Sequence, residues 1–200
     1  MTLLIRLAAP LQSWGDDSKF NTRRTAREPT KSGVIGLCAC ALGRRRTQSI
    51  ADLAALIYGV RTDKAGKLLT DYQTARKPNS SNPFISTRHY LCDAQFTAGL
   101  EGDAGLLAEI DAALRSPVFP LFLGRRSCPP TLPLSLGAVD KPLAEALCDG
   151  FSGTVVLDAV AAGALRRRDF PQSFSQKRRE HAFRGIEVRE VRDVHNENQY

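Results

Sequence analysis

The chain has 200 residues, of which 42% are apolar, and a formal net charge of +7. This length suits one substantial domain, or one domain with a small appendage, and the composition excludes a disordered chain. No run of about 18 apolar residues that could cross a membrane is present, and the charge favours a polyanionic partner without choosing among RNA, DNA and anionic lipid.

The first third of the chain predicts a strand followed by two helices. Residues 2–9 alternate and are rich in leucine and isoleucine, which indicates a strand rather than a signal peptide, so a cytoplasmic protein is the simplest interpretation. A basic loop over residues 16–29 follows. Helically spaced apolar residues then predict a helix that begins after Pro29 and ends at Gly43. A shorter helix is predicted over residues 49–57.

The next segments predict strands and a projection. Residues 58–62 and 67–76 look extended. Two prolines and several turn-forming residues between Arg76 and Arg88 predict a loop or a projecting hairpin. Strand alternation resumes over residues 89–98, so we expect this stretch to return to a sheet.

The remaining elements complete an α+β pattern. An amphipathic helix is predicted over residues 103–115, and residues 118–130 form an extended segment with a glycine turn. The order strand, helix, strand, strand, helix, strand is the ferredoxin-like pattern, which RNA-recognition motifs share. A short helix over 140–148 and strands over 154–160 and 183–191 predict a second, smaller β-rich part.

The five cysteines do not follow a metal or disulfide pattern. Their number is odd, and Cys38 and Cys40 are separated by one residue rather than the two of a zinc knuckle. Both lie in an apolar segment, where a thiol behaves as a small buried hydrophobe. We therefore predict reduced, structural cysteines and neither a metal nor a cofactor.

Basic residues gather in two parts of the chain. Between residues 16 and 46 there are eight lysines or arginines against three acidic residues, and between residues 161 and 184 there are seven against two. Arginine dominates both clusters, and it forms bidentate bonds to phosphate and stacks on bases. The clusters favour nucleic acid, although a solvated basic face would produce the same pattern.

The start of the first helix has the chemistry of an anion site. Its free N–H groups and its dipole favour a phosphate, and Thr30 and Ser32 add hydroxyl donors. Plain helix capping is the alternative, but it does not explain the basic residues that crowd this entry. They are Arg23, Arg24, Arg27 and Lys31.

Two other features suggest contact with RNA. Arg125, Arg126 and Ser127 follow a glycine turn, where they suit backbone phosphates or an acidic protein surface; a solvent-exposed pair is the alternative. Trp14, beside Gln12, could stack on a base, although packing in the core explains a single tryptophan equally well.

Catalytic chemistry is scarce in this sequence. The three histidines, His89, His181 and His195, are far apart and form no recognisable acid–base pair. The glycine spacing of a P-loop is missing before Lys31, which excludes nucleotide hydrolysis on that pattern. We predict no catalytic residue. The alternative is a metal-independent endoribonuclease, with the His89–Tyr90 region and Lys31 as its acid–base set.

A series of motifs resembles one known family. The most specific are Pro29-Thr30-Lys31-Ser32-Gly33 and Leu123-Gly124-Arg125-Arg126-Ser127-Cys128-Pro129, supported by Leu7–Gly15, Arg24-Thr25 and Tyr90–Ala94. In this order and at this spacing they resemble the CasD family of type I-E CRISPR Cascade subunits, in the RAMP superfamily. The resemblance extends over about residues 3–137 and is weak beyond residue 140.

The resemblance implies both a fold and a role. It implies a ferredoxin-like domain over residues 1–137 with a thumb at about 76–88, and a smaller β-rich region over 138–200. Members cap the 5′ handle of the CRISPR guide RNA (crRNA) and contact the backbone and large subunits of the antiviral complex. Target DNA is then met only through that complex. RNA cutting in type I-E belongs to a separate endonuclease, which agrees with a non-catalytic subunit.

The predicted RNA path crosses the first domain. The helix entry and the arginines hold phosphates, Gln12 reads splayed bases, and the loop from Arg76 to Arg88 separates handle from spacer. A basic run near the C-terminus extends the track. The predicted RNA-binding residues are Gln12, Trp14, Arg23, Arg24, Arg27, Thr30, Lys31, Ser32, Arg76, Arg88, Arg125, Arg126, Ser127, Lys177, Arg178 and Arg179.

Overall fold

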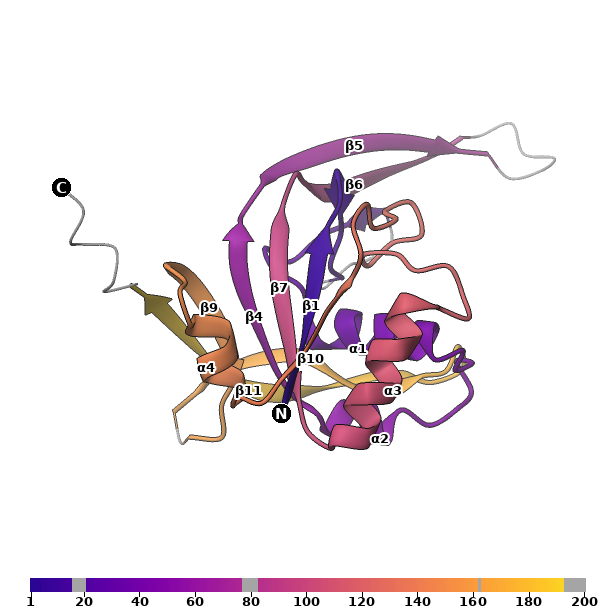
Figure 1. Ribbon diagram of the computed structural model, residues 1–200. Helices are drawn as coiled ribbons and strands as arrows, with labels where there is room; N and C mark the ends of the chain where they lie inside the picture. The colour runs from indigo at the N-terminus through magenta and orange to yellow at the C-terminus, as the bar shows by residue number, and fades with distance from the viewer. Residues whose placement is uncertain (16–20, 77–82, 162, 193–200) are drawn as a thin grey trace.

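A large sheet, a smaller sheet and four helices make up the described part of the chain (Figure 1). The computed structural model describes residues 1–15, 21–76, 83–161 and 163–192. Within them, the five cysteines are unpaired, and Cys38 and Cys128 are buried. No helix of these residues is long and apolar enough to span a membrane.

The centre of the large sheet confirms the ferredoxin-like prediction. Its strands are β1 (Thr2–Ala8), β4 (Ile57–Lys64), β7 (Gln95–Glu101) and β8 (Ser135–Val139). They lie in the order β4-β7-β1-β8, and every pair is antiparallel. Helix α1 (Lys31–Ala41) falls between β1 and β4 along the chain, and α3 (Ala104–Arg115) falls between β7 and β8. This is the βαββαβ arrangement.

The C-terminal strands join the same sheet. They are β9 (Gly153–Asp158), β10 (Leu165–Phe174) and β11 (Arg179–Val191). Strand β9 pairs with β4, with Val60 opposite Val156, so the full order is β10-β11-β9-β4-β7-β1-β8. Strand β10 was not predicted, because three consecutive arginines at its start interrupt the apolar alternation that marks a strand.

Alternation along the strands divides the core between two faces of the sheet. On β1, Leu3, Ile5 and Leu7 are fully buried in the main core, which also contains residues of α1 and α3. The opposite face carries a smaller cluster, in which Leu143 and Leu147 of α4 (Leu143–Cys148) pack near β9. A short helix, α2 (Ala51–Ala55), completes the helices and confirms the prediction near residues 49–57.

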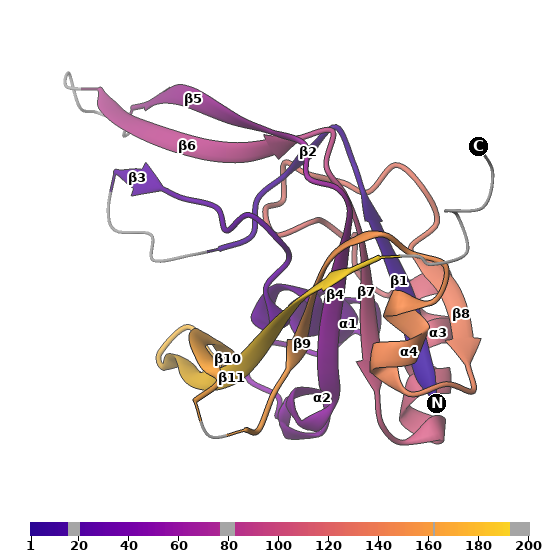
Figure 2. The ribbon, with the colours of Figure 1, turned by 90° about the vertical axis from the view of Figure 1, so that its left-hand side faces the viewer.

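The smaller sheet forms a projection from the body (Figures 1 and 2). It contains β2 (Leu11–Gln12), β3 (Thr22–Arg23), β5 (Lys67–Ala75) and β6 (Phe84–Cys92). Strands β5 and β6 pair over their whole length as a hairpin. The predicted loop from residue 76 to 88 is partly strand, since β6 begins at Phe84; residues 77–82 lie outside the described residues.

Two sequence predictions of strands are wrong in detail. The single strand expected over residues 89–98 is two strands in different sheets, because the chain turns at Asp93, which has a φ of 53°. The segment 118–130 is a loop and not the fourth strand, which is β8. Four prolines flank or interrupt that segment and cannot donate to a ladder; Leu123 N–H bonds instead to the Cys128 carbonyl within the loop.

Candidate nucleic-acid interface

Gln12 and Trp14 lie in the interior and are fully buried. The Gln12 amide donates to the carbonyls of Leu7 and Ala94 at 3.0 and 2.7 Å, and its oxygen accepts from Trp14 Nε1 at 3.0 Å. These bonds use the polar groups of both side chains. The structure therefore gives the two residues a packing role in place of the predicted contact with bases.

The entry of α1 already holds an anion of the protein itself. Thr30 caps the helix, and the Asp169 carboxylate from β10 accepts from Lys31 N–H at 2.9 Å. The Lys31 ammonium is buried and bonds to Asp158 at 2.9 Å. Ser32 is partly exposed, with its hydroxyl 3.4 Å from that of Thr30. Asp169 occupies the position predicted for phosphate, so Thr30 and Lys31 are structural in this conformation.

A buried ionic network surrounds this entry; we define it as Lys31, Asp158, Asp169 and Arg184. Arg184 bonds to Asp158 at 2.5 Å and to Asp169 at 2.6 and 2.9 Å. Burial lowers the pKa of Lys31, although Asp158 opposes this shift. Burial also opposes the charge of Arg184, but the two carboxylates outweigh it and raise the pKa of Arg184. The network is electrically neutral and joins α1 to β9, β10 and β11.

Four arginines meet where β3, β6 and the loop after Gly124 come together. Arg23 and Arg88 are opposite each other in the parallel pairing of β3 with β6. Arg125 Nη2 donates to the Arg23 carbonyl at 2.8 Å and to the Arg24 carbonyl at 3.4 Å. We call Arg23, Arg24, Arg88 and Arg125 the arginine cluster. The structure thus joins three segments that are distant in sequence.

Tyr90 organises the inner side of the arginine cluster. The Arg125 guanidinium lies 4.8 Å from the centre of the Tyr90 ring. Burial raises the pKa of Tyr90, but interactions with Ser127, Arg125 and Arg88 outweigh it, so the pKa is lowered overall. Arg88 Nε and Arg125 Nη1 are buried and have no hydrogen-bond partner among the described residues. Such donors are rare in folded proteins and call for an acceptor.

Gly124 fixes the position of Arg125. Its φ is 83°, a region that residues with a side chain rarely adopt, and a Cβ there would lie 1.8 Å from the Ser13 carbonyl oxygen. The Ser13 N–H also donates to the Leu123 carbonyl at 3.1 Å. Only glycine allows the loop to approach the chain this closely, so the turn noticed in the sequence places Arg125 over β3.

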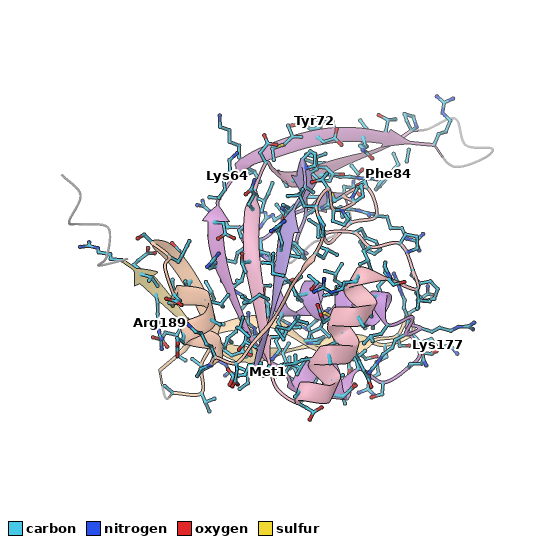
Figure 3. All side chains as sticks on the ribbon, in the orientation of Figure 1. Met1, Lys64, Tyr72, Phe84, Lys177 and Arg189 are labelled. Carbon is cyan, nitrogen blue, oxygen red and sulfur yellow. The ribbon has the colours of Figure 1, made fainter. Side chains whose placement is uncertain are left out.

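The other predicted residues are spread more widely. Arg27 is exposed between β3 and α1, Arg76 is exposed at the end of β5, and Arg126 is exposed on the side of Cys40 in α1. The predicted basic run of the C-terminal region is exposed at the β10–β11 turn: Lys177, Arg178 and Arg179. Figure 3 shows Lys177 pointing away from the body. This turn is about 25 Å along the strand from Arg168.

Two hollows flank the segment that links β3 to α1. In Figure 2 this segment runs between the β5–β6 hairpin and the β10–β11 hairpin. The hollow of about 240 Å³ lies toward the β5–β6 hairpin and is lined by Arg24, Thr25, Leu68 and His89. The hollow of about 290 Å³ lies toward β10. Its basic lining residues are Arg27, Arg167 and Arg168. Sequence reasoning missed Arg167 and Arg168 as site residues and recorded them only as part of a charge run.

The structure does not assemble the alternative catalytic set. His89 and Tyr90 point to opposite faces of β6, and Lys31 belongs to the buried ionic network. His181 is half-buried, and burial lowers its pKa; His195 lies outside the described residues. Across residues 1–15, 21–76, 83–161 and 163–192, no group of three or more potential metal-binding side chains is found.

The ferredoxin-like sheet, the projecting hairpin and the arginine cluster define an RRM-like protein with a basic face. The chain belongs to the family described as CRISPR-associated protein (Cas_Cas5), whose model matches residues 2–187. It is 36% identical to the CRISPR system Cascade subunit CasD of Escherichia coli (strain K12) over a region covering 68% of this chain and 70% of that protein. This confirms the resemblance seen in the motifs.

Two solved structures share the fold over nearly the whole chain. One, described as the crystal structure of a Cas protein, has a TM-score of 0.79 and 41% identity, covering 96% of this chain and 95% of its own. The other, from a CRISPR RNA-guided surveillance complex, has a TM-score of 0.81 and 30% identity, covering 96% and 90%. The β9–β11 strands are therefore part of the shared architecture.

Proposed function

We propose that this chain is the non-catalytic subunit of a type I-E Cascade complex that binds and caps the 5′ handle of the crRNA. The observation that carries the proposal is the arginine cluster, in which Arg88 Nε and Arg125 Nη1 are buried donors without a partner among the described residues. Phosphate oxygens are acceptors of the required kind, and arginine donates to them with both geometric fit and charge. Membership of the family and similarity to CasD support the same role.

The proposed path lies between the projecting hairpin and the segment that links β3 to α1. The handle backbone crosses the arginine cluster, and Ser127 and Arg126 extend the contact at the loop. The exposed Phe84 on the hairpin (Figure 3), which alternation places on the same face of β6 as Arg88, offers a surface for an unstacked base. Arg76 and the residues beyond it would divide handle from spacer, and the Lys177–Arg179 turn would continue the basic track.

The proposed partners follow from this role. The backbone and large subunits of the complex would contact this chain in the cytoplasm, and target DNA would be read by pairing with the guide. RNA cutting would fall to another protein, since Lys31, His89 and Tyr90 do not converge on one site.

Fluorescence anisotropy at fixed salt tests the proposal. We expect the full chain to bind RNA with the repeat-derived 5′ handle more tightly than scrambled RNA of equal length, and a gel should show both RNAs intact. Equal affinity for the two RNAs would argue against handle recognition by this subunit. Cleavage of repeat RNA in the absence of metal would instead favour the endoribonuclease alternative.

Arg27→Ala should weaken RNA binding without unfolding the protein. Arg27 is exposed and makes no ion pair or hydrogen bond with the described residues, so its loss removes a phosphate contact only. The slope of log K against log salt should flatten by about one unit. Arg189→Ala is the matched control, because Arg189 lies near Cys148 on the opposite face of the sheet. An unchanged slope in Arg27→Ala would remove this residue from the RNA path.

A further inference from the structure

The hollow beside β10 contains more positive charge than the carboxylates of the described residues neutralise. Its lining includes Arg27, Arg167 and Arg168, together with Glu28 and Asp169. Asp169 is used by the neutral ionic network, and Glu28 pairs with Arg167 at 2.6 Å. Among the carboxylates of the described residues, none pairs with Arg27 or Arg168.

The contacts of Arg27 and Arg168 agree with this excess of positive charge. Within the described residues, Arg27 makes no ion pair or hydrogen bond, and Arg168 donates through Nε to the His181 carbonyl at 3.4 Å. A carbonyl oxygen carries only a partial charge. Both guanidinium groups can therefore donate hydrogen bonds to an anion in the hollow without breaking an ion pair with a described residue.

Arg167 supplies an independent sign of a missing ligand. One of its terminal nitrogens binds Glu28, but the other, Nη1, is buried and has no partner among the described residues. An unsatisfied buried guanidinium N–H is costly, and because Arg167 lines the hollow, an acceptor bound there is a candidate partner for this nitrogen. An acceptor there would meet donors from three arginines.

We propose that this hollow binds one phosphate group of the RNA, held by Arg27 and Arg168 with Arg167 as a further donor. A terminal phosphate carries about −1.5 to −2 charges at pH 7 and would balance both free arginines, whereas a backbone phosphodiester would balance one. RNA is the favoured source because Arg27 is three residues from Arg24, so the hollow lies about 10 Å along the chain from the arginine cluster. The identity of the ligand as RNA rests on the proposed function.

The test uses Arg168→Gln in the full chain. Arg168 is exposed and outside the buried ionic network, so the melting temperature should stay at the wild-type value. We expect affinity for handle RNA to fall about tenfold, as for loss of a charge-assisted bond, and the salt slope to flatten by about one unit. Arg27→Gln should behave alike. Arg189→Gln, an equal charge change on the other face, should bind as the wild type does.

Two forms of the same RNA identify the phosphate. If 5′-phosphorylated RNA binds the wild type more tightly than 5′-hydroxyl RNA, and Arg168→Gln removes that gain, the terminal phosphate occupies the hollow. If the wild type binds both forms equally, and Arg168→Gln loses the same affinity for both, an internal phosphodiester occupies the hollow. If Arg168→Gln binds both RNA forms with the same affinity and salt slope as the control Arg189→Gln, the proposal is overturned.

Scrambled RNA separates this inference from the proposed function. If the wild type binds handle and scrambled RNA equally, handle recognition fails. A loss in Arg168→Gln on both RNAs would still establish the phosphate site. Conversely, if the wild type prefers handle RNA and Arg168→Gln binds both RNAs with the wild-type affinity, the proposed function is retained and the phosphate site is rejected.

Discussion

Asp169→Asn should lower the free energy of unfolding by about 3–5 kcal/mol, the usual cost of removing one partner from a buried ion pair. The Asp169 side chain is 4% exposed and accepts two bonds from Arg184 and one from the backbone N–H of Lys31. Asparagine keeps the shape of the side chain but removes its charge. Asp158 would then be the one carboxylate left in the network, shared by Arg184 and Lys31.

Urea unfolding of the variant and the wild type measures this effect. Glu187→Gln provides the control, because it breaks an exposed pair with Arg189 on the same β hairpin and should change the free energy of unfolding far less than Asp169→Asn. A loss in Asp169→Asn no larger than in this control would show that the network contributes little, and that apolar packing alone holds β10 against α1.

Gly124→Ala should destabilise the protein by about 2–5 kcal/mol and weaken RNA binding as well. Two costs combine here: the left-handed backbone at φ 83°, and the overlap of a Cβ with the Ser13 carbonyl oxygen, 1.8 Å away. The loop would have to withdraw from Ser13, which would carry Arg125 away from the Arg23 carbonyl. Thermal unfolding and RNA anisotropy measure the two effects.

Gly137→Ala separates the two costs. Gly137 has a similar φ of 91°, but a Cβ there meets no atom within 4 Å. We expect a loss of about 1–2 kcal/mol from the backbone conformation alone, and unchanged RNA binding. Equal losses of stability in the two variants would contradict a role for the close approach to Ser13.

The central fold was predictable because its signals are local. Apolar alternation in β1 and helical spacing in α1 and α3 each fall within one element, and their order is enough to indicate the ferredoxin-like arrangement. The fourth strand was misplaced because segment 118–130 is as apolar as a strand. Its irregularity comes from prolines and from close packing of the loop against Ser13, which spacing alone does not reveal.

The candidate site was predictable only where charge and exposure coincide. Arg23, Arg24 and Arg125 were selected from basic runs, and the structure brings them together with Arg88. Lys31 came from the same reasoning but is buried, because its partners Asp158 and Asp169 lie 127 and 138 residues away. A sequence pattern cannot show that a carboxylate so distant fills a helix entry. Nor can it show that the Gln12 side chain donates to two backbone carbonyls and accepts from Trp14 Nε1.

The pairing of β4 with β9 bears on how the chain matures on the ribosome. Gly59 of β4 lies opposite Leu157 of β9, so about a hundred residues are synthesised between these two paired positions. Until then β4 is an open edge, and Lys31 lacks Asp158. Contacts across such long separations form slowly and leave nascent chains prone to aggregation. An incomplete chain that ends before β9 therefore leaves the β4 edge of its sheet unpaired.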